Sequence, residues 1–181
     1  MLPINKIISS FDAYLAIRGL HFEGVVIGGA ALNLLGVVSR LTRDCDVLDP
    51  QIPDEILSAS IAFANEQRSI GNVDITKHWF NNGPATLKRN LPKKWESRLV
   101  PVFTGKAIIF KGLARADLLK TKLYAQADRQ DDLADCVALK PTLLELKDSI
   151  EWVQNQDANP NWPKHVENIF TEVAKVLGYE F

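Results

Sequence analysis

Two carboxylates stand one residue apart in the stretch Asp44-Cys45-Asp46. Successive side chains of a β-strand alternate between the faces of a sheet, so on a strand both aspartates emerge on the same face. Neighbouring carboxylates repel each other at neutral pH unless a cation offsets them, and Mg²⁺ prefers oxygen ligands of this kind. The spacing therefore predicts that Asp44 and Asp46 bind Mg²⁺ or Mn²⁺ and act as catalytic carboxylates; an ordinary solvated surface pair is the alternative interpretation.

A pair of glycines precedes these acids and follows the β-branched run over residues 25–27. Glycine has no Cβ, so a polyphosphate can approach the backbone closely, and the start of a following helix offers N–H donors. The next loop adds two hydroxyls and a permanent cation, which suit a polyanion. These features predict a binding site for the triphosphate of a nucleoside triphosphate (NTP). A plain turn is the alternative interpretation. The residues of this predicted site are Gly28, Gly29, Ser39, Arg40 and Thr42.

A second group of charged residues lies between Ala116 and Cys136. Lys122 and Arg129 are seven residues apart and share a helix face, and Asp132 and Asp135, three apart, share one as well. A salt-bridged pair of surface helices is one interpretation of these four residues.

The elements around the first group alternate between strand and helix. Apolar residues at helical or strand spacing, Gly36 and Asp49-Pro50 set most of the boundaries, and Asp54 is the expected N-cap of the last helix. The expected elements are a helix over 4–18, a strand over 25–27, a helix over 30–35, a strand over 44–48 and a helix over 54–66. This is the start of an α/β unit, with the glycines between a strand and a helix and the acids on the next strand.

Residues 69–95 show no readable periodicity and are interpreted as a long, partly ordered loop. Strands over 99–103 and 107–110, joined through Thr104-Gly105, are expected to extend the sheet as a hairpin. Neither contains an acid. Asp74 is the nearest candidate for a further carboxylate, and an ordinary loop residue is the other interpretation.

From residue 117 onward the pattern is helical. The expected elements are helices over 117–129, from 131 or 132 to before Pro141, over 142–154 with a capping box from Thr142 to Glu145, and from Pro163 to Gly178, with a polar linker over 155–161. The predicted organisation is a core over 1–113 and a C-terminal helical part over 114–181 packed on that core.

The order of the glycine pair, the short helix and the Asp-X-Asp on the next strand resembles the nucleotidyltransferase superfamily, with its polymerase-beta-like fold. The resemblance implies an α/β (α+β) fold with a mixed sheet flanked by helices. It also implies metal-dependent transfer of a nucleotidyl group from an NTP to a hydroxyl of RNA or protein. One departure is that many active members carry a third carboxylate on a later strand, which this chain lacks at the corresponding place.

The run from Ala116 to Cys136 resembles the helical motifs of AbiEii-type toxin nucleotidyltransferases and their small relatives. The resemblance implies that Lys122 and Arg129 bind the triphosphate, that Lys122 is catalytic, and that Asp132 or Asp135 orients these cations or acts as a base. It further implies a toxin that pairs with a cognate antitoxin. The fragment Trp79-Phe80-Asn81 resembles a short turn in the same relatives.

The composition of the chain bears on whether it binds nucleic acid and on its cellular compartment. The formal net charge of -1 provides no global basic field for nucleic acid, so an RNA contact must be local. Lys88-Arg89 and Lys93-Lys94, near two tryptophans, form either an RNA-facing edge or a solvated loop. Cys45 and Cys136 lack metal-type spacing and fit reduced thiols in the cytoplasm. No targeting signal or membrane span is recognised.

Two hypotheses are alternatives to an enzymatic function. The absent third acid allows a catalytically degenerate nucleotidyltransferase fold that binds a nucleotide or a protein partner without turnover. A purely structural α/β module is the other, and its stability would respond to neither nucleotide nor metal.

Overall fold

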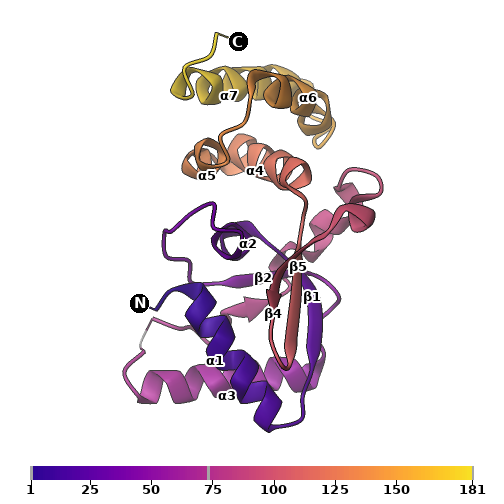
Figure 1. Ribbon diagram of the computed structural model, residues 1–181. Helices are drawn as coiled ribbons and strands as arrows, with labels where there is room; N and C mark the ends of the chain where they lie inside the picture. Colours follow the sequence, from indigo (N-terminus) through magenta and orange to yellow (C-terminus); the bar gives the residue numbers. More distant parts are fainter. Residues whose placement is uncertain (1, 73, 181) are drawn as a thin grey trace. The chain divides into compact units, whose positions relative to one another are not determined.

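A computed structural model describes residues 2–72 and 74–180 of the chain. The chain forms two compact units, the first made of Met1–Arg89 and Glu96–Leu113 and the second of Asn90–Trp95 and Ala114–Phe181. The first unit contains the β-strands together with the first three α-helices of the chain, and the second unit is mainly helical (Figure 1).

The chain up to residue 113 contains every helix and strand expected from the sequence, with shifted ends. The elements are α1 (Ile4–Ile17), β1 (Phe22–Ile27), α2 (Gly28–Leu34), β2 (Cys45–Asp49), α3 (Asp54–Ser69), β3 (Phe80–Asn81), the 3₁₀-helices η1 (Gly83–Asn90) and η2 (Trp95–Arg98), β4 (Val100–Thr104) and β5 (Ile108–Gly112). The expected long loop over 69–95 thus contains a short strand and 3₁₀ turns. Asp54 is the first residue of α3 rather than its N-cap, a position that Pro53 takes.

Five strands form one mixed sheet in the order β3-β2-β1-β5-β4 (Figure 1). β1 runs antiparallel to β2 and parallel to β5, β2 is parallel to β3, and β4 pairs antiparallel with β5. The expected α/β fold with a mixed sheet and the hairpin is confirmed. Within this sheet β2, which carries Asp46, lies between β1 and β3.

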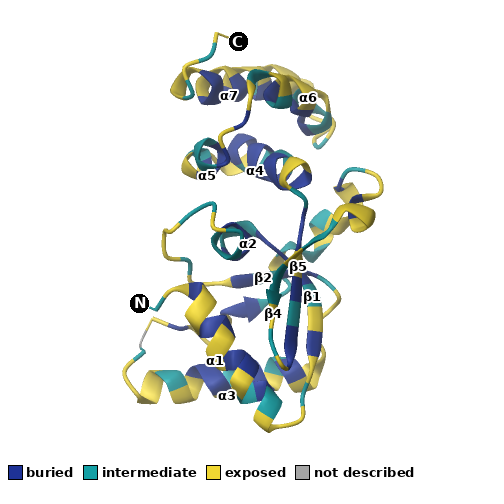
Figure 2. Cartoon of the chain, in the orientation of Figure 1, coloured by how far each residue is buried: buried dark blue, intermediate teal, exposed yellow. Residues whose placement is uncertain are grey.

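Aromatic rings fill the core between α1, α3 and the sheet. Phe11 of α1 lies with its ring centroid 5.2 Å from that of Phe63 on α3 and 5.2 Å from that of Trp79, and 5.7 Å from that of Phe80 on β3. Figure 2 shows the buried faces of α1 and α3. Trp79 is fully buried in this aromatic core, directly before the short strand β3.

A buried carboxylate ties α1 to the β4–β5 turn. Asp12 accepts hydrogen bonds from the backbone N–H groups of Lys106 (3.1 Å), Ala107 (2.8 Å) and Ile108 (2.8 Å). Burial alone raises the pKa of Asp12, but these three donors outweigh it and hold the pKa below its usual value. A Cβ at Gly105 would lie 2.2 Å from an Asp12 oxygen, so glycine lets the turn approach the carboxylate.

Replacing Asp12 by alanine is expected to lower the free energy of unfolding by about 3 kcal/mol, because three buried donors lose a charged acceptor. The lowered pKa means that wild-type Asp12 stabilises above the unfolded pKa of about 3.9 and that this stabilisation is lost as pH falls through the folded pKa. Urea unfolding at neutral pH and below pH 4 measures both effects. The exposed Asp54→Ala variant is the control; equal losses in the two variants would contradict the role of Asp12.

The second unit is a bundle of four helices. They are α4 (Arg115–Arg129), α5 (Leu133–Ala138), α6 (Leu143–Gln154) and α7 (Trp162–Val176). The capping box is confirmed: Glu145 N–H donates to Thr142 Oγ1, and Thr142 N–H donates to a Glu145 carboxylate oxygen. Backbone donation by Thr142 and the nearby Arg115 guanidinium keep the pKa of Glu145 below its usual value. Pro163 lies in the first turn of α7, as expected.

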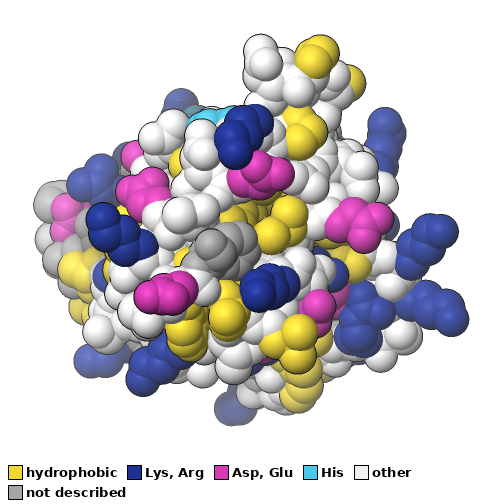
Figure 3. Space-filling view, turned by 90° about the horizontal axis from the view of Figure 1, so that it is seen from above, with side chains coloured by type: hydrophobic (Ala, Val, Ile, Leu, Met, Phe, Trp, Pro, Cys, Tyr) yellow, Lys and Arg dark blue, Asp and Glu magenta, His cyan; other side chains and the backbone are white. Residues whose placement is uncertain are grey.

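Charges of both signs are mixed over the face shown in Figure 3, with hydrophobic side chains between them. This mixture agrees with the formal net charge of -1. Among the described residues, no helix is both long enough and apolar enough to cross a membrane.

Candidate active site

The turn between β1 and α2 brings the backbone to a carboxylate. Gly28 has φ +68, a left-handed conformation that favours glycine, and it is also the first residue of α2. The turn and the helix start therefore coincide, whereas the sequence predicted a helix only from residue 30. Ile27 pairs with Asp46 across the sheet, and a Cβ at Gly28 would lie 3.1 Å from Asp46 Oδ2. A side chain at Gly28 would press on this carboxylate as well as strain the backbone, so glycine suits both the turn and its approach to Asp46.

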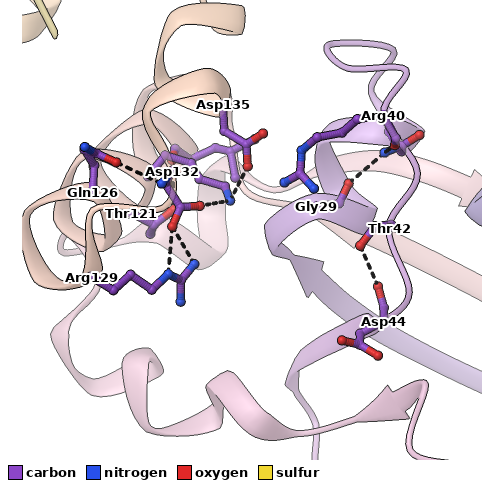
Figure 4. A network of polar contacts seen from close by, with 12 residues as sticks. Gly29, Arg40, Thr42, Asp44, Thr121, Gln126, Arg129, Asp132 and Asp135 are labelled. Atoms are coloured by element: carbon purple, nitrogen blue, oxygen red, sulfur yellow. Dashed lines mark hydrogen bonds and ion pairs between the residues drawn. The ribbon is translucent and has the colours of Figure 1, made fainter. Parts of the chain in front are cut away.

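The loop after α2 folds back onto the second glycine (Figure 4). A Cβ at Gly29 would lie 2.9 Å from Thr42 Oγ1 and 3.5 Å from Arg40 Nη2. Asn33 holds the loop in place, since its Nδ2 donates to the Gly29 carbonyl (3.2 Å) and to the Arg40 carbonyl (2.9 Å). The Thr42 hydroxyl and the Arg40 guanidinium thus lie at the glycine turn, while Ser39 is exposed on the same loop.

The two aspartates flank a buried cysteine. Asp44 is exposed just before β2, Cys45 is fully buried, and Asp46 is half-buried on the strand, which is the alternation expected of a strand. Burial and the negative charges of Asp46 and Asp44 raise the pKa of the Cys45 thiol far above its usual value, so the thiol stays neutral. We call Gly28, Gly29, Arg40, Thr42, Asp44 and Asp46 the corner site.

Asn81 is a contact of the site that the sequence did not predict. β3 pairs Asn81 with Asp46, and Asn81 Nδ2 donates to Asp46 Oδ1 at 3.2 Å. Asn81 Oδ1 accepts a hydrogen bond from Gly83 N–H at 2.6 Å, so the side chain is held with its NH₂ group toward the Asp46 carboxylate. The similarity of Trp79-Phe80-Asn81 to a turn in related proteins was the only signal in the sequence.

The corner site offers two carboxylates, those of Asp44 and Asp46, as oxygen donors for a divalent cation. Over residues 2–72 and 74–180 no group of three or more His, Cys, Asp or Glu side chains is placed to hold a metal ion, and Asp74 does not complete such a group. Mg²⁺ commonly takes one or two protein carboxylates and fills its shell with water and substrate phosphate oxygens. Asp44 and Asp46 would supply these two carboxylates.

A buried ion cluster occupies the second unit (Figure 4). Lys122 Nζ lies 2.6 Å from Asp132 Oδ1 and 2.6 Å from Asp135 Oδ2. Arg129 contacts the other Asp132 oxygen through Nε at 2.8 Å and Nη2 at 2.6 Å. Gln126 Oε1 accepts from the Asp132 backbone N–H at 2.8 Å. We call these five residues the helical ion cluster.

Burial divides the helical ion cluster into an inner and an outer part. The side chains of Lys122, Asp132 and Asp135 are 6%, 4% and 2% exposed, whereas Arg129 is 58% exposed. The ion pairs agree with the interpretation of these four residues as salt-bridged, but Lys122, Asp132 and Asp135 are buried rather than at a solvated surface. Burial also raises the pKa of the neighbouring Cys136 thiol to about 12.

The chain matches a protein-family model described as "Nucleotidyltransferase of unknown function (DUF6036)" over residues 5–157. It belongs to this family, and the matched range contains both the corner site and the helical ion cluster. No curated protein and no solved structure was found to match it. The family match confirms the nucleotidyltransferase class and does not extend to the AbiEii-type toxins.

Proposed function

We propose that the protein transfers a nucleotidyl group from an NTP to a hydroxyl of RNA or protein, with Mg²⁺ or Mn²⁺ held by Asp44 and Asp46. The observation that carries the proposal is the position of Gly28 against Asp46 Oδ2, because it lets a polyphosphate reach a carboxylate-bound cation. The acceptor oxygen bonds to the α-phosphorus, the bond from that phosphorus to the β-bridging oxygen breaks, and pyrophosphate leaves with the electron pair. The acceptor proton passes to a base or to water.

The residues of the corner site have distinct tasks in this proposal. The Gly28 and Gly29 backbone, the Arg40 guanidinium and the Thr42 hydroxyl bind triphosphate oxygens. Asp44 and Asp46 would hold the cation, which when bound would neutralise charge on the phosphate oxygens and lower the pKa of the attacking hydroxyl. Asn81 positions the Asp46 carboxylate through its 3.2 Å hydrogen bond. Ser39, exposed on the same loop, offers one more hydroxyl to the phosphates.

In the helical ion cluster, we propose that Arg129 is the residue that can bind a phosphate oxygen. The Arg129 side chain is 58% exposed, and Asp132 orients its guanidinium. The guanidinium can therefore bind an anion without losing its contact with Asp132. Lys122 is enclosed by two carboxylates, and its charge is already balanced. This geometry favours a positioning role for Lys122, Asp132 and Asp135 over direct phosphate contact or proton removal.

A mixture of the purified protein, Mg²⁺, total RNA and each α-³²P-labelled NTP in turn tests the transfer. Label is expected in RNA or in protein with at least one NTP, and chelation by EDTA is expected to abolish it. If no NTP labels either acceptor while an NTP still raises the melting temperature, the catalytically degenerate alternative holds. The absence of an acid from β4 and β5 is the observation that favours that alternative.

We further propose that the enzyme is the toxin of a toxin–antitoxin pair, on the resemblance of residues 116–136 to AbiEii-type toxins. Induced expression of the wild-type chain is then expected to arrest bacterial growth, and the Asp46→Asn variant to leave growth unaffected. Equal growth of both strains at matched protein levels would refute the toxin role and leave the enzymatic proposal standing.

A further inference from the structure

A pocket of about 140 Å³ adjoins the corner site within the first unit. Its lining comprises apolar side chains, two amides, the charged side chains of Arg43 and Asp74, Gly71, and Thr42 of the corner site. The lining used below consists of Leu2, Ile7, Ile75, Gln67, Asn72 and Thr42. Thr42 Oγ1 also lies 2.9 Å from the Cβ position of Gly29, so the pocket and the corner site share a wall.

The volume of the pocket is large enough for one part of a nucleotide but too small for a whole nucleotide. An apolar cavity of about 150 Å³ accepts one benzene-sized ring, whereas pockets for complete ligands begin at about 300 Å³. Ile7 and Ile75 are buried, and Leu2 is half-buried, which provides apolar surface for the face of a planar ring. The dimensions therefore match one aromatic ring.

Two amides give the pocket a hydrogen-bonding edge. Asn72 Nδ2 donates to Gln67 Oε1 at 2.7 Å, and Asn72 N–H donates to the Gln67 carbonyl at 3.0 Å. These bonds fix both side chains at the end of α3. Among the contacts of the described residues, the side-chain amide oxygen of Asn72 (Oδ1) and the side-chain NH₂ group of Gln67 (Nε2) remain available to a ligand. An acceptor beside a donor complements the edge of a nucleobase.

We propose that this pocket binds the nucleobase of the NTP whose triphosphate occupies the corner site. The ring packs on the apolar side chains of Ile7 and Ile75, and its polar edge bonds to Gln67 and Asn72. Thr42 separates the base from the phosphates. The inference rests on the proposed function and adds to it the residues that select the base.

Calorimetric titration of the full chain with the four NTPs and with ribose 5-triphosphate, all with Mg²⁺, tests the proposal. The best NTP is expected to bind about tenfold more tightly than ribose 5-triphosphate, which lacks a base. Asn72→Ala and Gln67→Ala are expected to reduce this advantage to less than threefold and to leave the affinity for ribose 5-triphosphate unchanged. Asn65→Ala, exposed on the same helix α3, is the matched control and should retain the full advantage.

The Gln67→Glu variant adds a readout that damage to the fold would not produce. A carboxylate replaces a donor with an acceptor, so the ranking of the four NTPs is expected to change. An unchanged ranking, or a wild-type protein that binds ribose 5-triphosphate as tightly as every NTP, would overturn the base pocket and leave the proposed function intact. Failure of the wild-type protein to bind any triphosphate would overturn both.

Discussion

Replacing Asp46 by asparagine is expected to lower the rate of nucleotidyl transfer about a thousandfold, or about 4 kcal/mol in the activation barrier. Asn81 Nδ2 donates to Asp46 Oδ1 at 3.2 Å, and an amide oxygen can accept the same bond. The fold should therefore persist while the negative charge that holds the cation is lost. Single-turnover transfer from a labelled NTP at saturating Mg²⁺ measures the loss.

The matched control is Asp49→Asn on the same strand. Asp49 pairs with Lys88 at 2.5 Å, and both side chains are exposed to solvent, so its charge lies in an ordinary surface pair. Transfer by this variant is expected to stay within threefold of wild type. Addition of Mn²⁺ together with an NTP should raise the melting temperature of wild type and of Asp49→Asn but not of Asp46→Asn. If Asp46→Asn retained more than a tenth of the wild-type rate, Asp46 would not be the cation ligand of the reaction.

Local patterns predicted most of the fold because their causes are local. The Thr142–Glu145 capping box and the β-branched run before Gly28 each act over a few residues, and both occur where the sequence placed them. β3 escaped prediction because it is only Phe80–Asn81, too short to show a strand period. Its existence depends on Trp79 in a core contributed by distant segments, and such packing leaves no periodic trace.

The same limit applies to the candidate site. Spacing alone places Lys122 and Arg129 on one helix face, but it does not tell a buried face from a solvated one, because charged residues are typical of exposed faces. Burial of Lys122 depends on α5, which brings Asp132 and Asp135 to it. Likewise, the acids of β2 were recognisable from their spacing, whereas the contact of Asn81 with Asp46 required the pairing of β2 with β3.

The second large effect is expected from Lys122→Met, which should lower the free energy of unfolding by about 3–5 kcal/mol. Methionine keeps an unbranched side chain as far as Cε but removes the ammonium group that lies 2.6 Å from carboxylates of both Asp132 and Asp135. The buried carboxylates of Asp132 and Asp135 then both lose their contact with the Lys122 ammonium. Urea unfolding followed by circular dichroism measures the change.

Lys164→Met in the same unit removes the same group from an exposed pair. Lys164 and Glu167 lie 3.0 Å apart with side chains 76% and 50% exposed, so the expected change is below about 1 kcal/mol. The double variant Lys122→Met/Asp135→Asn should be less destabilised than the sum of its single variants, because the second change removes the charge of a carboxylate that contacts Lys122. Strict additivity, or equal losses for Lys122→Met and Lys164→Met, would mean that Lys122 is solvated and free to reach a phosphate, which would return it to the role of triphosphate ligand.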